Sequence, residues 1–477
     1  MRKLLLSPLP LIALLGACTV GPNYAGPPKV ATTDAPGGHF VRGGKVATAQ
    51  APQVANWWTS LGDTTLNELE TRALAGSPNL AVAQARVKQA RASFKLERAN
   101  QLPKASASAS YIHAQIPGVD FTGSGNEIDS LDLVNLGFDA SWEIDLFGGQ
   151  RRTVEAARAT LESAEANVAD AQVQLSAEVA QSYVNLRDRQ ARLALIRQTG
   201  ALQRQTLDLT RQRLSRGTAS QLDVERLQSQ VETTEAQAVP IAAEIESYMN
   251  ALAVLTGEAP GALDTMLQAR GAVPLPPASV AIGDPSELLQ RRPDIRAAER
   301  KLASQTAKIG QAEAARFPRL SFMGLIGIGG SKISDLTDPG NLSAIIAPQL
   351  SWSFLDFGRN AARVRQAEGV RDEAEAQYRQ TVLAALQDAE DSLSRFGHRR
   401  ESLASLVRIK ASADRASVLM QQRYRAGTAT LIDALDAERQ RVVAEQNLAQ
   451  TSAALTNDYV ALQKALGLGW SAEPAAR

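Results

Sequence analysis

The same pattern of residues occurs twice in this chain of 477 residues, and this repeat constrains the fold more than any other feature. Trp142 and Gly148 recur as Trp352 and Gly358, at an offset of 210 residues. A constant offset over about eighty residues, with no insertion or deletion, is typical of two copies of one long helix followed by a turn. The matching groups are Trp142, Phe147 and Gly148 with Trp352, Phe357 and Gly358; Arg213, Gly217, Thr218, Ala219 and Asp223 with Arg423, Gly427, Thr428, Ala429 and Asp433; and, at an offset of 215, Pro78, Arg86, Pro103 and Lys104 with Pro293, Lys301, Pro318 and Arg319. The sequence therefore predicts two similar halves.

Each half is predicted to hold a helix, two strands, a very long helix, a turn and a returning helix. In the first half, 61–255, strands are expected at about 104–115 and 131–142, a long helix at about 150–214 and a return helix at about 219–255. In the second half, 286–466, strands are expected at about 319–330 and 342–354, a long helix at about 359–425 and a return helix at about 429–466. A Pro-rich linker, 256–285, joins the halves, and 467–477 forms a tail.

The long helices are expected to pack on more than one side. No proline interrupts Gln150 to Leu214, and at a rise of 1.5 Å per residue such a helix is about 95 Å long. Apolar residues step by three and four along it, with small residues in alternate layers: Val154, Ala157, Leu161, Ala164, Val168, Ala171 and Leu175. Small residues allow close approach of neighbouring helices, which favours a cylinder of helices. A solid coiled-coil spacer is the alternative.

The short segments alternate as strands do. Leu136, Phe138 and Trp142 are apolar at even positions, whereas the odd positions between them are small or polar. In the second half, Met323, Leu325 and Ile345 interrupt this alternation, and Pro348 requires an edge strand or a bulge. Segments of about ten residues with this alternation, bounded by Trp, are typical of transmembrane barrel strands. A soluble β-subdomain packed on helices is the alternative.

Barrel closure connects the strands to an oligomeric state. An open sheet edge is not tolerated in lipid, and about eight strands is the smallest barrel. Two copies of four strands give eight strands and a filled interior, whereas three copies give twelve strands and room for a channel. The sequence therefore predicts a homotrimer if the strands lie in a membrane.

The N-terminus has the pattern of an exported lipoprotein. Arg2 and Lys3 precede an apolar run, 4–14, that is too short to span a bilayer, and small residues lead to Cys18, the only cysteine. This pattern resembles a bacterial lipobox, which implies a signal peptide, 1–17, and acylation of Cys18 with chains such as palmitate. An ordinary signal peptide with an incidental cysteine is the alternative. The stretch 18–60 is predicted to be a lipid-anchored, extended tether, with Trp57 and Trp58 as packing anchors near its end.

Composition argues against nucleic-acid binding and against catalysis. With 51 basic and 50 acidic residues the net charge is +1, and no basic stripe with interleaved aromatics occurs. His39, His113 and His398 are the only histidines and are not spaced as metal ligands. No zinc-protease, nucleophile-elbow or phosphate-loop motif is present. The sequence therefore predicts no enzyme, cofactor or metal site.

Across almost the whole mature chain the sequence resembles the TolC-like outer-membrane factors, in particular the lipoprotein branch that serves multidrug efflux. The residues that carry the resemblance are Cys18-Thr19-Val20-Gly21-Pro22-Asn23-Tyr24, Trp57-Trp58, Pro285 to Arg296, Leu146-Phe147-Gly148 and Asp356-Phe357-Gly358. The resemblance implies a mainly α fold with a membrane β-barrel part: a homotrimer with a 12-stranded barrel and a 12-helix periplasmic tunnel. It also implies docking, through a periplasmic adaptor (membrane fusion) protein, onto an inner-membrane pump of the resistance-nodulation-division type. Thr19, which is not aspartate, implies sorting of the lipoprotein to the outer membrane.

The resemblance also implies two kinds of functional residue near the turns after the long helices. Asp433 and Asp436 match acidic residues at the periplasmic gate of the family, where three copies favour cations. Asp433 has a competing role, because Thr430 and Asp433 form a helix-capping pattern, whereas position 436 has no such duty. The turns resemble adaptor-docking tips: Arg216, Gly217 and Thr218, and Arg425, Gly427 and Thr428. Arg291 to Asp294 is interpreted as a helix start without a transport role.

These observations predict a passive, lipid-anchored exit channel in the outer membrane that conducts drugs or toxic compounds from a pump to the outside. Two alternatives remain open at this point. One is a channel coupled to an ABC exporter for protein secretion, and the other is a periplasmic coiled-coil scaffold that does not conduct.

Overall fold

The computed structural model describes residues 19–30, 39–44, 47–48, 50–117, 128–269 and 271–471. The expected signal peptide and Cys18 lie outside the described residues, so their predictions stay predictions. The described chain is mainly helical and contains four long strands, two in each half, which confirms the predicted fold class of the protomer. It divides into two units: 1–28, 87–164 and 298–378 form the first, and 29–86, 165–297 and 379–477 form the second.

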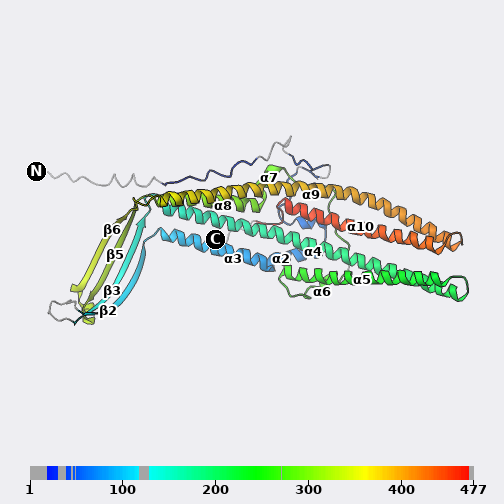
Figure 1. The fold of residues 1–477 in the computed structure, drawn as a ribbon, viewed down its shortest axis with the longest axis horizontal. Helices are drawn as coiled ribbons and strands as arrows, with labels where there is room; N and C mark the ends of the chain where they lie inside the picture. The colour runs from blue at the N-terminus through cyan, green and yellow to red at the C-terminus, as the bar shows by residue number, and fades with distance from the viewer. Residues whose placement is uncertain are drawn as a thin grey trace. The chain divides into compact units, whose positions relative to one another are not determined.

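The strands of the first unit form one antiparallel sheet, in the order β2 (Lys104–Pro117), β3 (Ile128–Ile144), β5 (Arg319–Gly330), β6 (Leu342–Ser351). Figure 1 shows the four strands side by side. The two strands of each half are neighbours, and β3 pairs with β5 to join the halves. Pro348 lies on β6, an edge strand of this sheet, as its sequence context required. The missing proline N–H is tolerated best at an edge. β6 ends at Ser351 instead of 354, because its partner β5 begins at Arg319.

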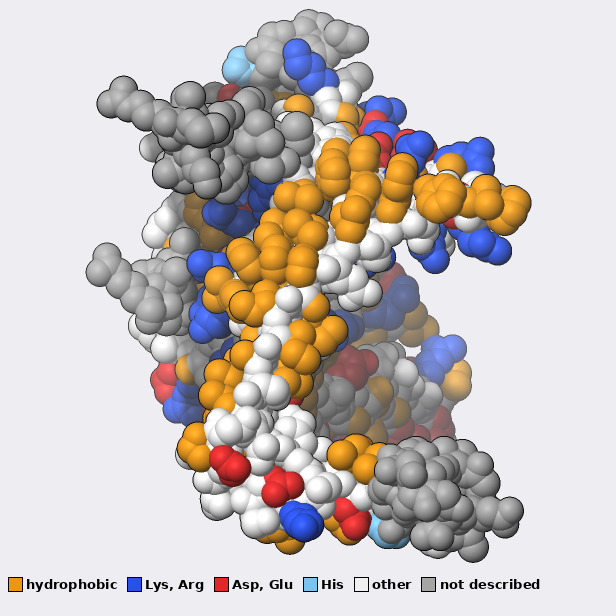
Figure 2. Space-filling view, turned by 90° about the vertical axis from the view of Figure 1, so that its left-hand side faces the viewer, with side chains coloured by type: hydrophobic (Ala, Val, Ile, Leu, Met, Phe, Trp, Pro, Cys, Tyr) orange, Lys and Arg blue, Asp and Glu red, His pale blue; other side chains and the backbone are white. Residues whose placement is uncertain are grey.

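The sheet carries an exposed apolar face. Residues directly opposite each other on neighbouring strands share a face, and Phe138 is opposite Ile326. Figure 2 views the molecule from the side that bears the strands in Figure 1 and shows hydrophobic side chains in a broad band. The exposed members of this apolar face are Tyr111, Leu136, Phe138, Trp142, Ile326, Leu342, Ile346 and Leu350. At one end, the Trp142 indole N–H donates to the Gln101 carbonyl and the Trp352 indole N–H to the Arg316 carbonyl, each at 3.0 Å.

Helices α3 (Pro78–Asn100) and α8 (Pro293–Ala314) precede the strand pairs, and α4 (Gly149–Ser215) and α9 (Arg359–Arg425) follow them. The two long helices contain 67 residues each. Of the predicted seam of α4, Leu175 is buried within the protomer, whereas Val154, Ala157 and Leu161 are half-buried, so the seam stays a prediction. Further buried positions are Arg152, Ala156, Ala159, Ala166, Val173 and Ala177. Because alanine is frequent on every side of this helix, its apolar pattern could not identify the face that packs within the protomer.

The returning helices are α5 (Gln221–Thr256) and α10 (Leu431–Ala465). Within the second unit, α2 (Thr64–Gly76) packs against α5, and the 3-10 helix η1 (Trp57–Leu61) buries both tryptophans. Trp57 meets Tyr459 of α10 edge to face, with ring centroids 6.0 Å apart. The prediction that Trp57 and Trp58 are packing anchors is therefore confirmed.

The tether and the linker are more structured than predicted. β1 (Ala47–Thr48) pairs in parallel with β4 (Val280–Ala281), and the linker also contains the short helix α6 (Asp264–Leu267). The short helix α7 (Pro285–Arg291) begins where the linker ends. Two-residue strands leave no periodic signal in a sequence, so the pairing was not foreseeable. Burial of Leu263, Leu267, Val280 and Ile282 holds this region in place.

Glu70 is a buried acid in the core beneath α2. Its side chain is 0% exposed, and neither carboxyl oxygen has a hydrogen-bond partner among the described residues. Leu66 and Ala73 lie one turn away on the same buried face, so Glu70 occupies a position that an apolar residue would fill. Burial away from water raises the pKa of Glu70 well above its ordinary value, because burial disfavours the charged form of the carboxyl.

Replacement of Glu70 by leucine is expected to stabilise the protein, and more so at higher pH. Below its ordinary pKa, Glu70 is protonated in both the folded and the unfolded protein, so its burial has no pH-dependent cost. Because the folded-state pKa is raised, the free energy of unfolding falls as the pH rises from the ordinary pKa towards the folded-state pKa. Between the two pKa values the benefit of Glu70→Leu should grow by about 1.4 kcal/mol per pH unit. Unfolding in detergent at pH 5 and pH 8 measures this. Glu68→Gln, on the exposed face of the same helix, is the control, and a gain for Glu70→Leu that is independent of pH would contradict the prediction.

Candidate functional site

The two helical tips close with the same backbone geometry. In the first, the Thr218 amide donates to the Arg213 carbonyl (2.9 Å) and the Gly217 amide to the Leu214 carbonyl (2.9 Å). Gly427 and Thr428 make the matching bonds at the end of α9. This is a Schellman ending, in which the glycine adopts a positive φ, +76° at Gly217 and +73° at Gly427. The residues predicted as docking tips are all exposed: Arg216, Gly217, Thr218, Arg425, Gly427 and Thr428.

Asp433 is engaged in a capping box at the start of α10. Its Oδ2 accepts hydrogen bonds from the Thr430 hydroxyl (2.7 Å) and amide (3.0 Å), and its own amide donates to the Thr430 hydroxyl. These bonds stabilise the charged form and hold the pKa of Asp433 below its ordinary value. Ser220 and Asp223 form the equivalent box on α5. The competing capping role that the sequence indicated is therefore present.

Asp436 is exposed but is not free. Arg439 donates from Nη2 to Oδ1 of Asp436 (2.7 Å), and Gln440 donates from Nε2 to Oδ2 (2.9 Å). Asp436 takes no part in the capping box, as the sequence indicated, but a cation on the next turn pairs with it. The Arg439 guanidinium holds the pKa of Asp436 below its ordinary value, so the carboxylate stays charged while part of its field is compensated.

A contact that the sequence analysis missed joins the two hairpins. Arg213 donates from Nη1 to the Tyr424 hydroxyl (2.6 Å), and its guanidinium lies 5.3 Å from the centre of the Tyr424 ring. Beside it, Leu431 and Leu435 pack against a buried cluster formed by Leu207, Val224, Leu227 and Val231. A difference between the two repeats could have indicated this contact, because Tyr424 occupies the position that is Leu214 in the first half. The two tips of the protomer are tied together at this point.

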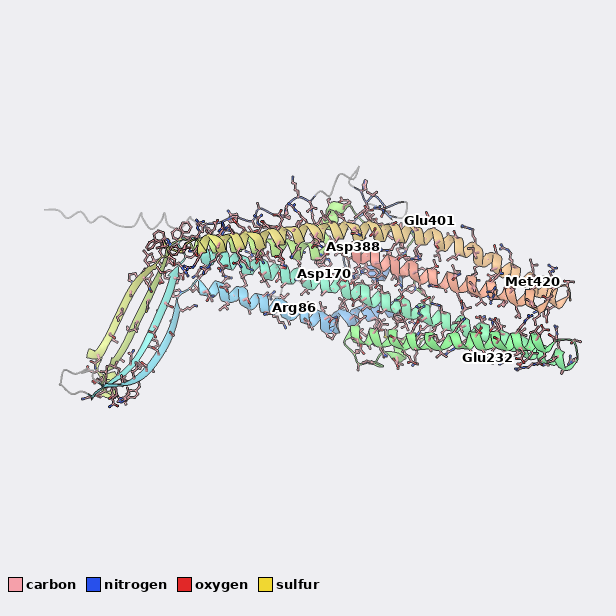
Figure 3. All side chains as sticks on the ribbon, in the orientation of Figure 1. Arg86, Asp170, Glu232, Asp388, Glu401 and Met420 are labelled. Atoms are coloured by element: carbon pink, nitrogen blue, oxygen red, sulfur yellow. The ribbon has the colours of Figure 1, made fainter. Side chains whose placement is uncertain are left out.

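Arg292 directly precedes the helix start at Pro293 that the sequence indicated, and it also makes contacts to other elements. Its side chain is 9% exposed, donates from Nε and Nη2 to the two oxygens of Asp294 (3.0 and 2.6 Å), and donates from Nη1 to the Ala465 carbonyl (2.7 Å). It thereby connects the start of α8 to the end of α10. Figure 3 labels Asp170 on α4 and Asp388 on α9, which line a cavity of about 470 Å³ with Arg292, Asp294, Arg395 and Lys464. Burial and the nearby Asp294 raise the pKa of Asp170.

A second arginine holds the segment that follows Cys18, 19–24, which we call the strap. Arg152 on α4 is buried and donates to the Val20 carbonyl (3.1 Å), the Gly21 carbonyl (2.9 Å) and the Asn23 side-chain oxygen (2.8 Å). The Val20 amide in turn donates to the Phe147 carbonyl (3.1 Å). A methyl group at Gly21 would lie 2.3 Å from Cα of Gly310 on α8, so the strap can lie this close only with glycine there.

The strap ends in a polar contact and covers only one of the two strand-to-helix junctions. The Tyr24 hydroxyl donates to Oε1 of Glu299 (3.0 Å), and the Arg300 guanidinium lies 5.6 Å from the Tyr24 ring. A methyl group at Gly148 would lie 2.6 Å from Thr19, whereas Gly358, its repeat equivalent, faces open space. Phe357 at that second junction is 83% exposed. The motif after Cys18 marked this segment in the sequence. Arg152 has Ala362 at its repeat position, so the repeat did not indicate which residue holds the strap.

Within the part of the chain that the structure describes, no group of three His, Cys, Asp or Glu side chains is placed to hold a metal ion. One helix, α5, has an 18-residue window apolar enough to cross a membrane, with 22% of that window buried. This match rests on length and composition alone. α5 is the returning helix after the first tip, and its capped N-terminus lies at that tip.

Comparison with known proteins gives consistent matches over nearly the whole chain. The family model described as "Outer membrane efflux protein" matches residues 69–258 and 285–468, one segment in each half. Outer membrane protein OprJ of Pseudomonas aeruginosa is 32% identical over 461 residues, covering 96% of this chain and 95% of OprJ. Toluene efflux pump outer membrane protein TtgI of Pseudomonas putida is 30% identical and covers 97% of this chain and 98% of TtgI. The solved outer-membrane channel OprN superposes with a TM-score of 0.88 at 35% identity, covering 95% of this chain and 100% of OprN.

Arg152→Ala is expected to release the strap. The substitution leaves the Val20 and Gly21 carbonyls without their donor, and charge-assisted bonds of this kind contribute about 2 kcal/mol. Amide exchange at Val20 should therefore accelerate about 30-fold, as measured by hydrogen–deuterium exchange. Arg151→Ala is the matched control, since the neighbouring Arg151 bonds to Asp145 and not to the strap. Unchanged protection at Val20 would show that the glycine packing alone holds the segment.

Proposed function

Because the chain belongs to the outer membrane efflux protein family, we propose that three copies of it form the exit channel of a tripartite efflux pump. The chain is an outer-membrane protein, as its relatives are. In the proposed assembly the channel is anchored by acyl chains on Cys18, takes compounds from a periplasmic adaptor and an inner-membrane resistance-nodulation-division pump, and conducts them outward passively. No chemistry is required of it.

The observation that carries the trimer is the open sheet. Both β2 and β6 are edge strands of a four-stranded sheet, and each presents a row of unpaired backbone groups within the described protomer. Because lipid cannot satisfy these groups, a sheet with an apolar outer face has to close on itself or on copies. Four strands cannot close, and three copies supply twelve strands with an open interior. In the same assembly, α4 and α9 with the returning helices α5 and α10 would contribute four helices from each protomer, twelve in all, to one tunnel wall.

The strap supports anchoring close to the barrel. Val20, two residues after Cys18, bonds to the β3–α4 junction through Phe147, so acyl chains on Cys18 would enter the bilayer near the periplasmic edge of the strands. Two or more acyl chains give firm anchoring, since each buried methylene contributes about 0.8 kcal/mol. The clamp by Arg152 would then transmit the membrane position of the anchor to α4 and α8.

The helical tips are proposed as the adaptor-docking surface and the gate. The six exposed tip residues are presented by rigid Schellman turns, which suits repeated docking of a partner. Asp436 and Asp433 lie on the first turns of α10, where three copies would converge and favour cations. Opening of the tip would require the two hairpins of a protomer to move, and the bond from Arg213 to Tyr424 opposes any motion that separates them.

The exported compounds are proposed to be drugs or toxic small molecules selected by the pump. The name of TtgI connects that relative with toluene efflux, and the name of OprJ gives no substrate. For this chain we extend the proposal to small apolar compounds on the same grounds of similarity. A protein-secretion channel and a non-conducting scaffold are the outcomes against which the proposal is tested.

Asp436 and Arg439 are expected to change ion preference in opposite directions. Asp436→Asn removes a carboxylate from the tip of each protomer, so the cation preference of the channel should fall. Arg439→Gln removes the cation that compensates Asp436, so the preference should rise while the pKa of Asp436 returns towards its ordinary value. Reversal potentials in planar bilayers under a salt gradient measure both. Equal reversal potentials for the wild type and both variants would contradict the gate assignment.

Cross-linking from the tips in intact cells tests the function itself. Thr218→Cys and Thr428→Cys, in a chain whose only native cysteine is Cys18, carry a photoreactive cross-linker, and mass spectrometry identifies the captured proteins. Capture of an adaptor together with a resistance-nodulation-division pump is the expected result. Capture of an ABC exporter would assign the channel to secretion. Capture of neither, in cells that express candidate pumps, would favour the scaffold.

A further inference from the structure

The face of the sheet opposite the apolar band is not uniformly polar. Cross-strand partners share a face, so each row across the four strands can be read from the pairing register. If three sheets close as proposed above, the apolar band faces lipid and the opposite face lines the channel, and the inference here rests on that proposal. Interior faces of wide barrels are normally polar.

Three successive rows of this interior face differ in character. The first contains only small residues, and the second and third contain the apolar side chains that interrupted the predicted alternation. The rows are Ser108, Gly137, Gly327 and Ser343; then Ser106, Asp139, Leu325 and Ile345; then Lys104, Ser141, Met323 and Ala347. A carboxylate therefore stands directly opposite Leu325, and Ile345 is opposite Leu325 on the next strand. The other residues of these three rows are small, apart from Lys104 and Met323.

Asp139 is oriented and available. The Ser108 hydroxyl donates to its Oδ2 (2.8 Å), which fixes one carboxyl oxygen and leaves the other free to accept a bond. Among the described residues, no cationic side chain lies within ion-pair distance of Asp139, although Lys104 is on the same face in the next row. An ionisable residue on a membrane strand is tolerated where it faces a water-filled interior. Water solvates the Asp139 carboxylate there, and its negative charge attracts cationic solutes.

The apolar part of the row is exposed and of a defined size. Ile345 is 57% exposed and Met323 55% exposed, and Leu325 between them is half-buried. Neighbouring strands lie about 4.8 Å apart, so the row extends about 10 Å from Asp139 to Ile345. That distance fits an organic molecule with a cationic group at one end and a ring or short alkyl body at the other. Met323 can adapt its shape to different bodies.

We propose that Asp139, Leu325 and Ile345 form a binding site for amphiphilic organic cations on the inner wall of the barrel. The carboxylate pairs with the positive charge, and Leu325 and Ile345 cover the apolar body. The site is shallow, so a bound molecule leaves again, and three copies give the barrel three such places for a solute in transit. Its substrate class is thus narrower than that of the channel as a whole, which need not select.

Channel block by tetraphenylphosphonium tests the site, with tetramethylammonium as a cation that lacks the apolar body. The assembled channel is reconstituted in planar bilayers, and the concentration that halves the current is measured. Asp139→Asn should weaken block by tetraphenylphosphonium about threefold, the size of an exposed ion pair. Leu325→Ser should weaken it by a similar factor and leave tetramethylammonium unaffected. Phe138→Leu is the control, because Phe138 is next to Asp139 in the chain but lies on the opposite, lipid-facing side of the sheet. It should not change the block by either cation.

Three results would overturn the site. The first is block that is unchanged by Asp139→Asn and Leu325→Ser, and the second is an equal loss for both cations in Leu325→Ser. The third is a loss of block with Asp436→Asn but none with Asp139→Asn, which would assign the site to the periplasmic tip. A wild-type protein that passes no current would instead count against the proposed channel. Tetraphenylphosphonium binding to the protein in nanodiscs, compared between the wild type and Asp139→Asn, then decides the site separately.

Discussion

The unpaired edges of the sheet are the constraint on which the rest of this structure depends. A backbone N–H or C=O in hydrocarbon has no water to bond to, and each unsatisfied group costs several kcal/mol. β2 and β6 present such groups along their whole length, while one face of the sheet is apolar and exposed. In the proposed trimer, these groups would pair with the edge strands of neighbouring copies. Each protomer contributes two equivalent strand pairs and two long helices in the same order, so identical copies would extend the sheet with matching elements.

The two halves have the same order of helices and strands, but they differ at the strand-to-helix junctions and near the ends of the long helices. The first strand-to-helix junction is covered by the strap, whereas the second is bare and exposes Phe357. Near its end the first long helix has Leu214, whereas the second has Tyr424, which bonds to Arg213 of the first. An arginine makes the contact in both places; Arg152 has no arginine at its repeat position, whereas at the tips the difference between the halves is Tyr424. Such single cations give direction to an interaction that apolar packing alone would leave unspecific, because charge-assisted hydrogen bonds have defined geometry.

Charge along the proposed path is balanced locally. The charge of Asp433 is stabilised by its capping bonds, whereas the charges of Asp436 and Asp294 are compensated by Arg439 and Arg292. Exposed pairs of this kind contribute little to stability, so their value lies in setting how much field remains for a passing ion. Asp139 departs from this pattern, since its described neighbours include a hydroxyl and apolar side chains but no paired cation. The acid in the core, Glu70, also has no paired cation, and burial raises its pKa and disfavours its charged form.

The sequence by itself determined the repeat, the four strands, the long helices and both turns. These features depend on local chemistry: alternation at Leu136 to Trp142, the absence of proline along α4, and glycine with a capping Ser or Thr after each long helix. The resemblance to a known family, which the comparisons confirmed, came from the same residues together with the motif after Cys18.

Only the tertiary structure decided which side of α4 packs inside the protomer, because alanines on several sides gave equivalent patterns and burial is a property of the neighbours. It alone supplied the partners of Arg152, Arg213, Arg292 and Asp436, as well as the pairing of β1 with β4. Most of these contacts join residues more than a hundred positions apart, and a long flexible arginine can reach many acceptors. A sequence shows that such a side chain exists, whereas its partner is chosen by the packing of the elements that bring both together.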